Sequence, residues 1–209
     1  MNLPLRVVAV LGLWLSGCVS SGMARTVNKG QLQVSVVPGV HAIPSNSGAR
    51  NDFAPHAELG VRYGVTNRLD VGARLFAPGA AVDVRLGLVR APTLNRGIDL
   101  TLAPSLAVAV RGRSDDMYGL AELPLLLGLN TGGRLQVIIG PRAGLQFGVD
   151  PSGFGASQQV LVGSSLGLAL PVGERVYIVP EVILRTPVSG FQPLVQGNLG
   201  LLLGGYRDN

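Results

Sequence analysis

The chain has 209 residues, enough for one domain of ordinary size, and it is unusually apolar, with 47% hydrophobic and 14% charged residues. Its net charge of +5 comes from scattered basic residues without interleaved aromatic residues, so nucleic-acid binding has no support. No stretch beyond residue 18 is apolar for the ~20 residues that a membrane-spanning helix needs. The composition therefore favours either a β-structure that faces lipid or a soluble β-domain with a large core.

The first residues are typical of an export signal. Arg6 supplies a weak positive charge, residues 7–15 are apolar and too short to span a membrane, and residues 15–18 read Leu-Ser-Gly-Cys. This order resembles the bacterial lipobox, in which a leucine and two small residues precede a lipidated cysteine. The resemblance implies that residues 1–17 are a cleaved signal peptide and that Cys18 carries acyl chains that anchor the protein in outer-membrane lipid.

Cys18 has one alternative role. It is the only cysteine of the chain, so an internal disulfide is excluded, and after an ordinary signal peptide it would be a free thiol or pair with another molecule. Residues 18–29 are mostly small or polar, and we expect them to be a lipidated tether. Residues 30–206 show no linker and are expected to form one β-barrel domain.

An alternation of apolar and polar residues with a period of two follows the tether and is typical of β-strands. In residues 56–65 it sets Ala57, Leu59, Val61, Tyr63 and Val65 against His56, Glu58, Gly60, Arg62 and Gly64. The pattern predicts about ten strands, each near the ~9–11 residues that a tilted strand needs to cross a bilayer. The predicted spans are 30–43, 54–65, 69–78, 80–91, 97–110, 117–130, 134–148, 158–171, 175–187 and 192–205.

The connections between these spans indicate an antiparallel up-and-down barrel. Tight turns at 66–68, 131–133 and 172–174 alternate with longer loops at 44–53, 111–116 and 149–157. Membrane barrels have short periplasmic turns and longer outward loops, which would leave Cys18 on the periplasmic side. The third and fourth spans could merge, so eight strands are an alternative to ten.

One face of the predicted strands carries charges of both signs. We expect this face to line a narrow lumen, where the charges form a ladder of ion pairs: Glu58, Arg62, Asp70, Arg74, Asp83, Arg85, Asp99, Glu122, Arg142, Glu181 and Arg185. In a soluble barrel or sandwich the same face would instead meet water. Aromatic residues make up only 5%, which leaves few candidates for interfacial girdles: Tyr63, Phe76, Tyr118, Phe147, Tyr177 and Tyr206.

Residues 60–72 read Gly-Val-Arg-Tyr-Gly-Val-Thr-Asn-Arg-Leu-Asp-Val-Gly. This segment resembles a phrase common in outer-membrane β-barrel proteins, in which one strand ends in a Tyr-Gly-Val-Thr-Asn-Arg turn and the next begins with Leu-Asp-Val-Gly. Thr and Asn favour the turn, and Leu-Asp-Val restarts the alternation. The resemblance implies an outer-membrane barrel and transfers no activity.

Catalytic and metal-binding signals are weak. His41 and His56 flank a loop that contains Ser45, Asn46, Ser47 and Asp52, which would be compatible with a hydrolase site at the barrel rim, as in omptin proteases or lipid A deacylases. Two histidines without a partner motif fall short of a zinc signature, and we expect neither a metal nor another cofactor. The sequence therefore predicts a non-enzymatic outer-membrane barrel with a structural, adhesive or narrow-channel role. The alternatives are a lipid-tethered soluble β-domain that binds a ligand or an envelope protein partner, and a rim-site hydrolase.

Overall fold

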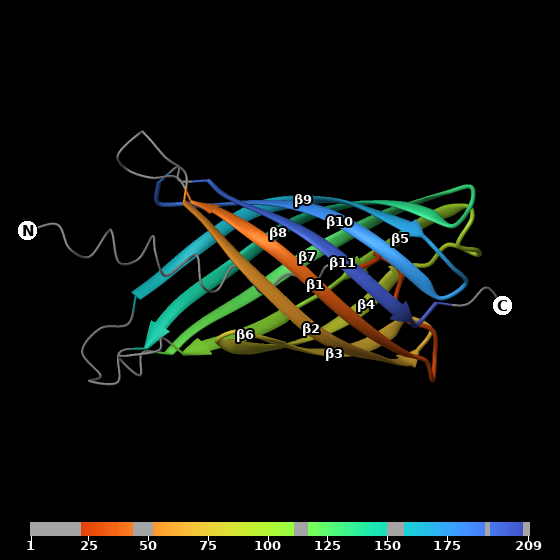
Figure 1. Cartoon of the computed structure of the whole chain (residues 1–209), viewed down its shortest axis with the longest axis horizontal. Coiled ribbons are helices and arrows are strands. Elements are labelled where there is room, and N and C mark those ends of the chain that lie inside the picture. The colour runs from red at the N-terminus through yellow and green to blue at the C-terminus, as the bar shows by residue number, and fades with distance from the viewer. Residues whose placement is uncertain (1–21, 44–51, 111–116, 150–156, 191–192, 207–209) are drawn as a thin grey trace, which may run out of the picture.

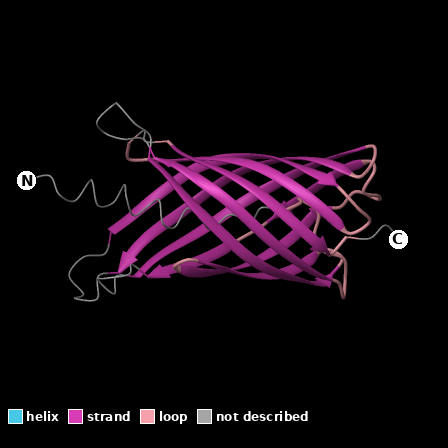
Figure 2. Cartoon of the chain, in the orientation of Figure 1, coloured by secondary structure: helices cyan, strands magenta, loops and turns pink. Residues whose placement is uncertain are grey.

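The computed structural model describes residues 22–43, 52–110, 117–149, 157–190 and 193–206, and in this part of the chain it consists of strands, turns and loops (Figure 2). The strands are β1 (Leu32–Ile43), β2 (Asp52–Thr66), β3 (Leu69–Phe76), β4 (Gly79–Val89), β5 (Gly97–Leu102), β6 (Ser105–Val110), β7 (Met117–Thr131), β8 (Leu135–Val149), β9 (Ser157–Pro171), β10 (Val176–Pro187) and β11 (Leu194–Gly204). The described residues include no helix long and apolar enough to cross a membrane.

The strands close into an antiparallel barrel (Figure 1). Strands that follow one another in the chain are paired, except β5 and β6, and β1 pairs with β11 to close the ring, with Gln33 opposite Gly204 and Ala42 opposite Val195. The short strands β5 and β6 occupy a single place between β4 and β7, with Ala103 and Pro104 between them. Ten strands therefore circle the barrel, as the alternation predicts, and the eight-strand alternative is wrong because β3 and β4 are separate, paired strands.

The two ends of the barrel differ in their connections. The tight turns at 67–68, 132–134 and 172–175 lie at one end, here called the short-turn end, together with the longer connection at 90–96 (Figure 1, right). The chain enters β1 and leaves β11 at this same end. In the turn at 132–134, Gly133 and Arg134 have φ of 74° and 65°, left-handed backbone that glycine adopts without cost.

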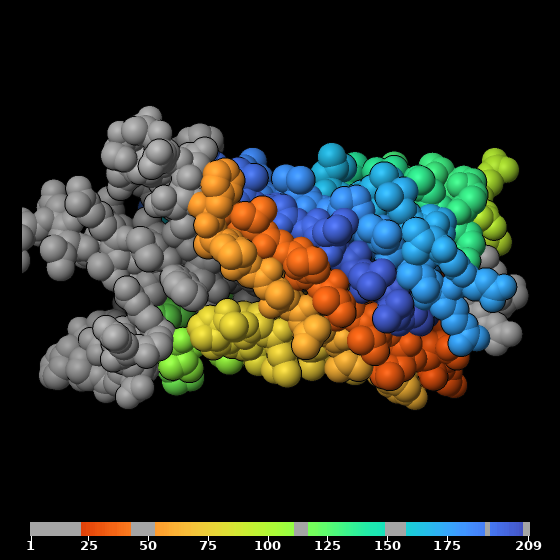
Figure 3. All heavy atoms as spheres, in the orientation of Figure 1, coloured from red at the N-terminus to blue at the C-terminus, as the bar shows by residue number. Residues whose placement is uncertain are grey.

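The apolar side of each strand faces outward. Figure 3 shows one side of this outer wall, to which successive strands contribute. Leu59, Leu75 and Leu166, for example, are 59%, 65% and 59% exposed, although they are large aliphatic side chains. The polar side faces the lumen, so Glu58 and Arg62 of β2 are buried while Leu59 and Val61 between them are exposed. This is the reverse of a soluble domain, which buries its aliphatic face and exposes its charges.

The aromatic residues are placed differently from the predicted interfacial girdles. Tyr63 lies on the outer wall at 48% exposure, but Phe76, Tyr177 and Tyr206 are buried inside the barrel. Phe76 and Tyr177 occupy lumen-facing positions of β3 and β10, where their rings fill space between the strands. The prediction that these three contribute to a girdle is therefore wrong.

The stretch before β1 also differs from the expected tether. The lumen segment, defined here as residues 22–28, lies inside the barrel near the short-turn end, and Met23 to Asn28 are all buried. At the rim, the amide of Gly30 donates to the carbonyl of Gly64 at 2.8 Å, and the chain then enters β1. The small side chains that suggested a free tether instead allow the segment to fit within the lumen.

Candidate functional site

The candidate site is the lumen, where all the side chains of the predicted charge ladder are buried. Close to the short-turn end, Arg85 donates two hydrogen bonds to Asp70, from Nε to Oδ1 at 3.0 Å and from Nη2 to Oδ2 at 2.8 Å. Arg62 bridges Asp70 and Asp83. Paired, hydrogen-bonded charges of this kind are the form in which ionised side chains tolerate burial.

A second group of ion pairs lies closer to the opposite end of the barrel, here called the long-loop end, where β2, β7 and β9 begin. Arg185 of β10 donates to both carboxylate oxygens of Glu122 of β7, at 2.7 and 3.0 Å, across the lumen. Arg74 pairs with Glu58 at 3.3 Å and with Asp83 at 3.4 Å. The Glu122–Arg185 pair joins strands that are not neighbours in the sheet, so it cross-links the lumen.

Arg142 and Asp99 are the members of the ladder with the least direct ionic pairing. Arg142 donates to the Ser165 hydroxyl at 2.8 Å and lies 3.6 Å from Glu181, and its Nε and Nη1 have no hydrogen-bond partner among the described residues. Asp99 accepts hydrogen bonds from the side-chain amides of Asn130 and Gln136, at 2.7 and 3.0 Å. The ladder is therefore a set of cross-links with polar amides and hydroxyls between them.

The lumen segment is held by hydrogen bonds between its backbone and side chains of the barrel wall. The amide of Ala24 donates to Gln136 Oε1 at 2.8 Å, and the amide of Val27 donates to Asp70 Oδ2 at 2.7 Å. The Thr101 hydroxyl donates to the Ala24 carbonyl at 2.6 Å, and Arg85 Nη1 donates to the Met23 carbonyl at 2.7 Å. These contacts bind the segment much as a groove binds an extended peptide.

Apolar side chains surround the same segment inside the barrel. Met23, Ala24 and Val27 pack against an apolar collar, defined here as Leu94, Leu126, Ile138, Tyr177, Val179, Leu202 and Tyr206, and Met23 has no exposed surface. Leu126, Ile138 and Leu202 face the lumen, and a second buried apolar cluster around Phe76 and Leu120 lies elsewhere in the barrel. The collar and the apolar side chains of the lumen segment pack into one buried cluster inside the barrel near its short-turn end.

Glycines of the wall make room for the lumen segment. A Cβ on Gly64 would lie 2.1 Å from the carbonyl oxygen of Asn28, and a Cβ on Gly128 would lie 2.8 Å from the Cβ of Ala24. Gly87 is roomier, since a Cβ there would lie 3.5 Å from the Thr26 side chain. The absence of a side chain at Gly64 and Gly128 is what lets the backbone of the segment approach the wall.

Two arginines lie where the lumen segment meets the short-turn end. Arg90 donates through Nη1 to the Thr26 hydroxyl at 2.9 Å and through Nη2 to the Asn28 side chain. Arg25 is only 6% exposed, and its Nε and Nη1 have no hydrogen-bond partner among the described residues. Burial lowers the pKa of Arg90, and the positive charge of Arg25 lowers it further. The segment thus brings a positive charge into the barrel, and two of its three nitrogens have no hydrogen-bond partner in the described part of the chain.

The two histidines meet in the lumen. Their rings stack with centroids 4.2 Å apart, and Gln196 Nε2 lies 3.1 Å from His56 Nε2. The side chains of Ser45, Asn46, Ser47 and Asp52 lie outside the described residues. Among the residues that the structure does describe, no cluster of three or more His, Cys, Asp or Glu side chains is arranged to hold a metal ion. Cys18, the predicted lipidation site, also lies outside the described residues.

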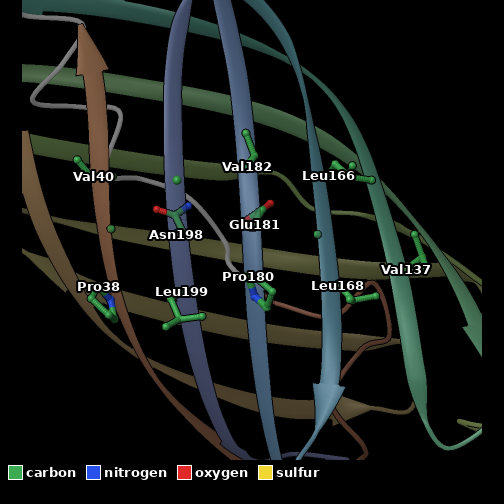
Figure 4. Close-up of a pocket in the computed structure, with 13 residues that line it drawn as sticks. Pro38, Val40, Val137, Leu166, Leu168, Pro180, Glu181, Val182, Asn198 and Leu199 are labelled. Carbon is green, nitrogen blue, oxygen red and sulfur yellow. The ribbon is translucent and has the colours of Figure 1, made fainter. Parts of the chain in front are cut away.

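A groove crosses the outer wall over β1, β11, β10, β9 and β8 (Figure 4). Its lining is dominated by outward-facing apolar side chains, among them Val40, Leu166, Val182 and Leu199. The groove is continuous with the apolar wall and lies on the opposite side of the sheet from the charged lumen. It has the chemistry of a lipid-facing surface rather than that of a site for a polar ligand.

The insertion of the lumen segment and the collar are the functional features that the alternation does not predict. A signal for the collar is present in the sequence, because consecutive apolar residues interrupt the alternation at Leu125–Leu127, Ile138–Ile139 and Leu201–Leu203. In each case one residue of the run must face the lumen. All three runs lie near the short-turn ends of their strands.

No protein-family model matches the chain, and no curated protein matches its sequence. Solved structures can be superposed on it. The translocator domain of the autotransporter NalP from Neisseria meningitidis superposes with a TM-score of 0.54 at 10% identity, covering 95% of this chain and 97% of that chain. The outer membrane protease OmpT from Escherichia coli gives 0.42 at 8% identity, covering 88% and 98%, and Neisserial surface protein A gives 0.37 at 14%, covering 85% and 99%. The likeness to the translocator domain shows a closed β-barrel fold and transfers no activity.

Proposed function

We propose that this protein is a membrane-spanning β-barrel of the bacterial outer membrane, exported by its signal peptide, anchored through lipid on Cys18, and without enzymatic activity. The observation that carries the proposal is the outer wall. Large aliphatic side chains cover it on every strand, whereas the charged side chains are buried in the lumen. In water such a surface would be an aggregation hazard, and in a bilayer it is the surface that lipid requires.

The lumen supports a non-enzymatic role. The charged side chains are engaged with one another, and the two histidines stack together beside Gln196. Charges held in this way brace the barrel from inside and leave a lumen too crowded for large solutes. Of the structural, adhesive and narrow-channel roles, the crowded lumen favours a structural role or that of a narrow channel.

The lipid anchor is supported by the sequence alone. The apolar run at residues 7–15 and the Leu-Ser-Gly-Cys order at 15–18 match the lipobox in position and spacing. Several acyl chains on one residue give stable membrane attachment, so the protein would be held in the membrane twice, by its wall and by its lipid.

The test is electrophoretic mobility of the outer-membrane fraction in SDS, with and without boiling, for the wild type and Cys18→Ala. A spanning barrel keeps its compact, faster band until it is boiled, and Cys18→Ala remains in the membrane fraction because the wall still holds it. If no heat-dependent shift occurs and Cys18→Ala is released from the membrane, the protein is a soluble β-domain held only by lipid. Incorporation of labelled palmitate into the wild type but not into Cys18→Ala tests the anchor separately.

A further inference from the structure

We propose that the lumen segment, residues 22–28, is a releasable plug, and that the barrel passes ions and small polar solutes when the plug leaves. This inference rests on the proposed membrane-spanning barrel and adds to it a gate and a class of permeant. Three observations carry it: the wall groups that bind the segment also bond to other wall groups, Arg25 of the segment is buried with two nitrogens unbonded among the described residues, and the segment packs against the apolar collar.

The wall groups that bind the segment are held in place by other wall groups. Asp70 keeps its bonds to Arg85 and Arg62 when the amide of Val27 is removed. Gln136 donates through Nε2 to Asp99 and Asn130, independently of its bond to Ala24. The wall network therefore needs only water in place of the segment, and the barrel does not depend on the plug for its polar pairing.

The segment itself is held in a way that allows release. It forms no strand of the barrel, and most of its hydrogen bonds run to individual side chains. Its bonds to wall backbone are from the Asn28 amide to the Gly205 carbonyl, at 2.9 Å, and from the Thr26 hydroxyl to the Asn67 carbonyl, at 2.8 Å. Arg25 carries its positive charge into the barrel with Nε and Nη1 unbonded, and Arg90 lies close enough to repel it. A buried charge with two nitrogens unbonded among the described residues favours departure, whereas the packing of Met23 in the collar favours retention. The plugged state is thus opposed by one feature of the segment and stabilised by another.

Withdrawal also reconciles the segment with lipid on Cys18. Acyl chains belong in a membrane leaflet, whereas Met23, five positions after Cys18, is enclosed by the barrel wall. An acylated chain would therefore be strained toward release of the segment.

The size and chemistry of the lumen set the permeant. With the plug withdrawn, the freed space is about that of one extended peptide, which admits ions and small polar solutes but not large ones. Beyond the collar, the passage is lined by the paired charges of the ladder and by the two nitrogens of Arg142 that have no partner among the described residues. The collar would face the open passage as an apolar constriction, a form of gate that closes by dewetting.

The test locks the plug with a disulfide. A Cβ on Gly87 would lie 3.5 Å from Cγ2 and Oγ1 of Thr26, so cysteines at these two positions would face each other where the segment meets the wall. The full-length double variant Thr26→Cys/Gly87→Cys, in a Cys18→Ser background that leaves no third thiol, is reconstituted in planar lipid bilayers. The oxidised protein should be silent, and reduction should raise the mean ionic conductance at least tenfold. Each single cysteine variant is a control that should not respond to oxidation or reduction.

A second pair of variants tests the same gate without a disulfide. Gly64→Ala places a Cβ against the Asn28 carbonyl and should increase the open probability, while Gly87→Ala meets only an ordinary contact and should behave as the wild type. Equal conductance of the oxidised and reduced double variant would overturn the plug. Silence of both the reduced double variant and Gly64→Ala would overturn the passage. In either case, a preserved heat-dependent mobility shift in the same samples would show that the spanning barrel stands, whereas loss of the shift in the wild type would refute the barrel and the plug together.

Discussion

The two halves of the lumen are closed by different means. The half toward the long loops is narrowed by side chains of the wall, which cross-link through pairs such as Glu122–Arg185. The half at the short-turn end is closed by a separate piece of chain, the lumen segment, against an apolar collar. The difference teaches that a barrel of ten strands has too wide a lumen for its own side chains to fill uniformly, and here a segment of backbone fills one end. Changes in the first half should destabilise the whole barrel, and changes in the second should release the segment.

The largest expected effect is that of Glu122→Gln, in the half closed by side chains. It leaves Arg185 buried without its carboxylate partner, and loss of one member of a buried pair costs about 3–5 kcal/mol in the free energy of unfolding. The measurement is urea unfolding in detergent, in which the folded fraction is monitored as the intensity of the compact band in unheated SDS gels. Glu174→Gln, the same change at an exposed turn residue, is the control and should change stability by less than about 0.5 kcal/mol. Equal stability of the two variants would contradict the cross-linking role.

Asp70→Asn and Asp83→Asn test whether the stability of the barrel and the retention of the lumen segment can be changed independently. Both carboxylates pair with Arg62, so both variants should lose roughly 3 kcal/mol of stability. Only Asp70 also accepts from the amide of Val27. The rate at which a maleimide labels a cysteine at position 26, in the Cys18→Ser background, should therefore rise in Asp70→Asn and stay near the reference in Asp83→Asn. Equal labelling in the two variants would break the distinction.

Met23→Ala tests the apolar hold on the segment. Truncation of a buried Met costs about 2–5 kcal/mol, and here the cost falls on the segment rather than on the barrel. Labelling of the cysteine at position 26 should rise at least tenfold, with unchanged resistance of the compact band to urea. Met117→Ala, on the outer wall at 49% exposure, should leave the labelling unchanged. If Met23→Ala weakens the whole barrel instead, the segment is part of the folding core and not a plug.

Thr101→Val has the smallest expected effect. It removes one hydroxyl that donates to the Ala24 carbonyl, a contribution of about 1 kcal/mol, or roughly a fivefold rise in labelling at position 26. Thr131→Val, which removes an exposed hydroxyl of a turn, should have no effect on the same rate. A Thr101→Val rate equal to the reference would mean that this bond does not hold the segment.

The barrel could be predicted from the sequence to a large extent, for a definite reason. An apolar outer wall and a charged lumen impose a strict period of two. The outward orientation of Leu59 and the inward orientation of Arg62 can therefore be predicted from the local sequence alone. The spans of β2 and β7 were predicted to within two residues, and the interruption of the fifth predicted span at Ala103 and Pro104 does not break the alternation.

The contents of the lumen could be predicted only in part. The sequence identifies the charged face but not the pairs, because partners such as Glu122 and Arg185 are far apart in the chain and on strands that are not neighbours. The lumen segment was predicted as a tether because its small residues suit either role. Its place depends on contacts with Asp70, Thr101 and Gln136, which no local pattern reveals.

The most direct test of the membrane-spanning barrel is quenching by brominated lipids of a fluorophore on single cysteines along β11, in the Cys18→Ser background. Val195, Leu199 and Leu203 all face outward, at 39%, 51% and 41% exposure, so each accepts a label without disturbing the lumen. The account predicts quenching at all three positions when the protein is reconstituted in vesicles, strongest at Leu199 with bromine near the bilayer centre. Uniformly weak quenching at the three positions, equal to that of a label at the turn residue Val172, would contradict a barrel that spans the membrane.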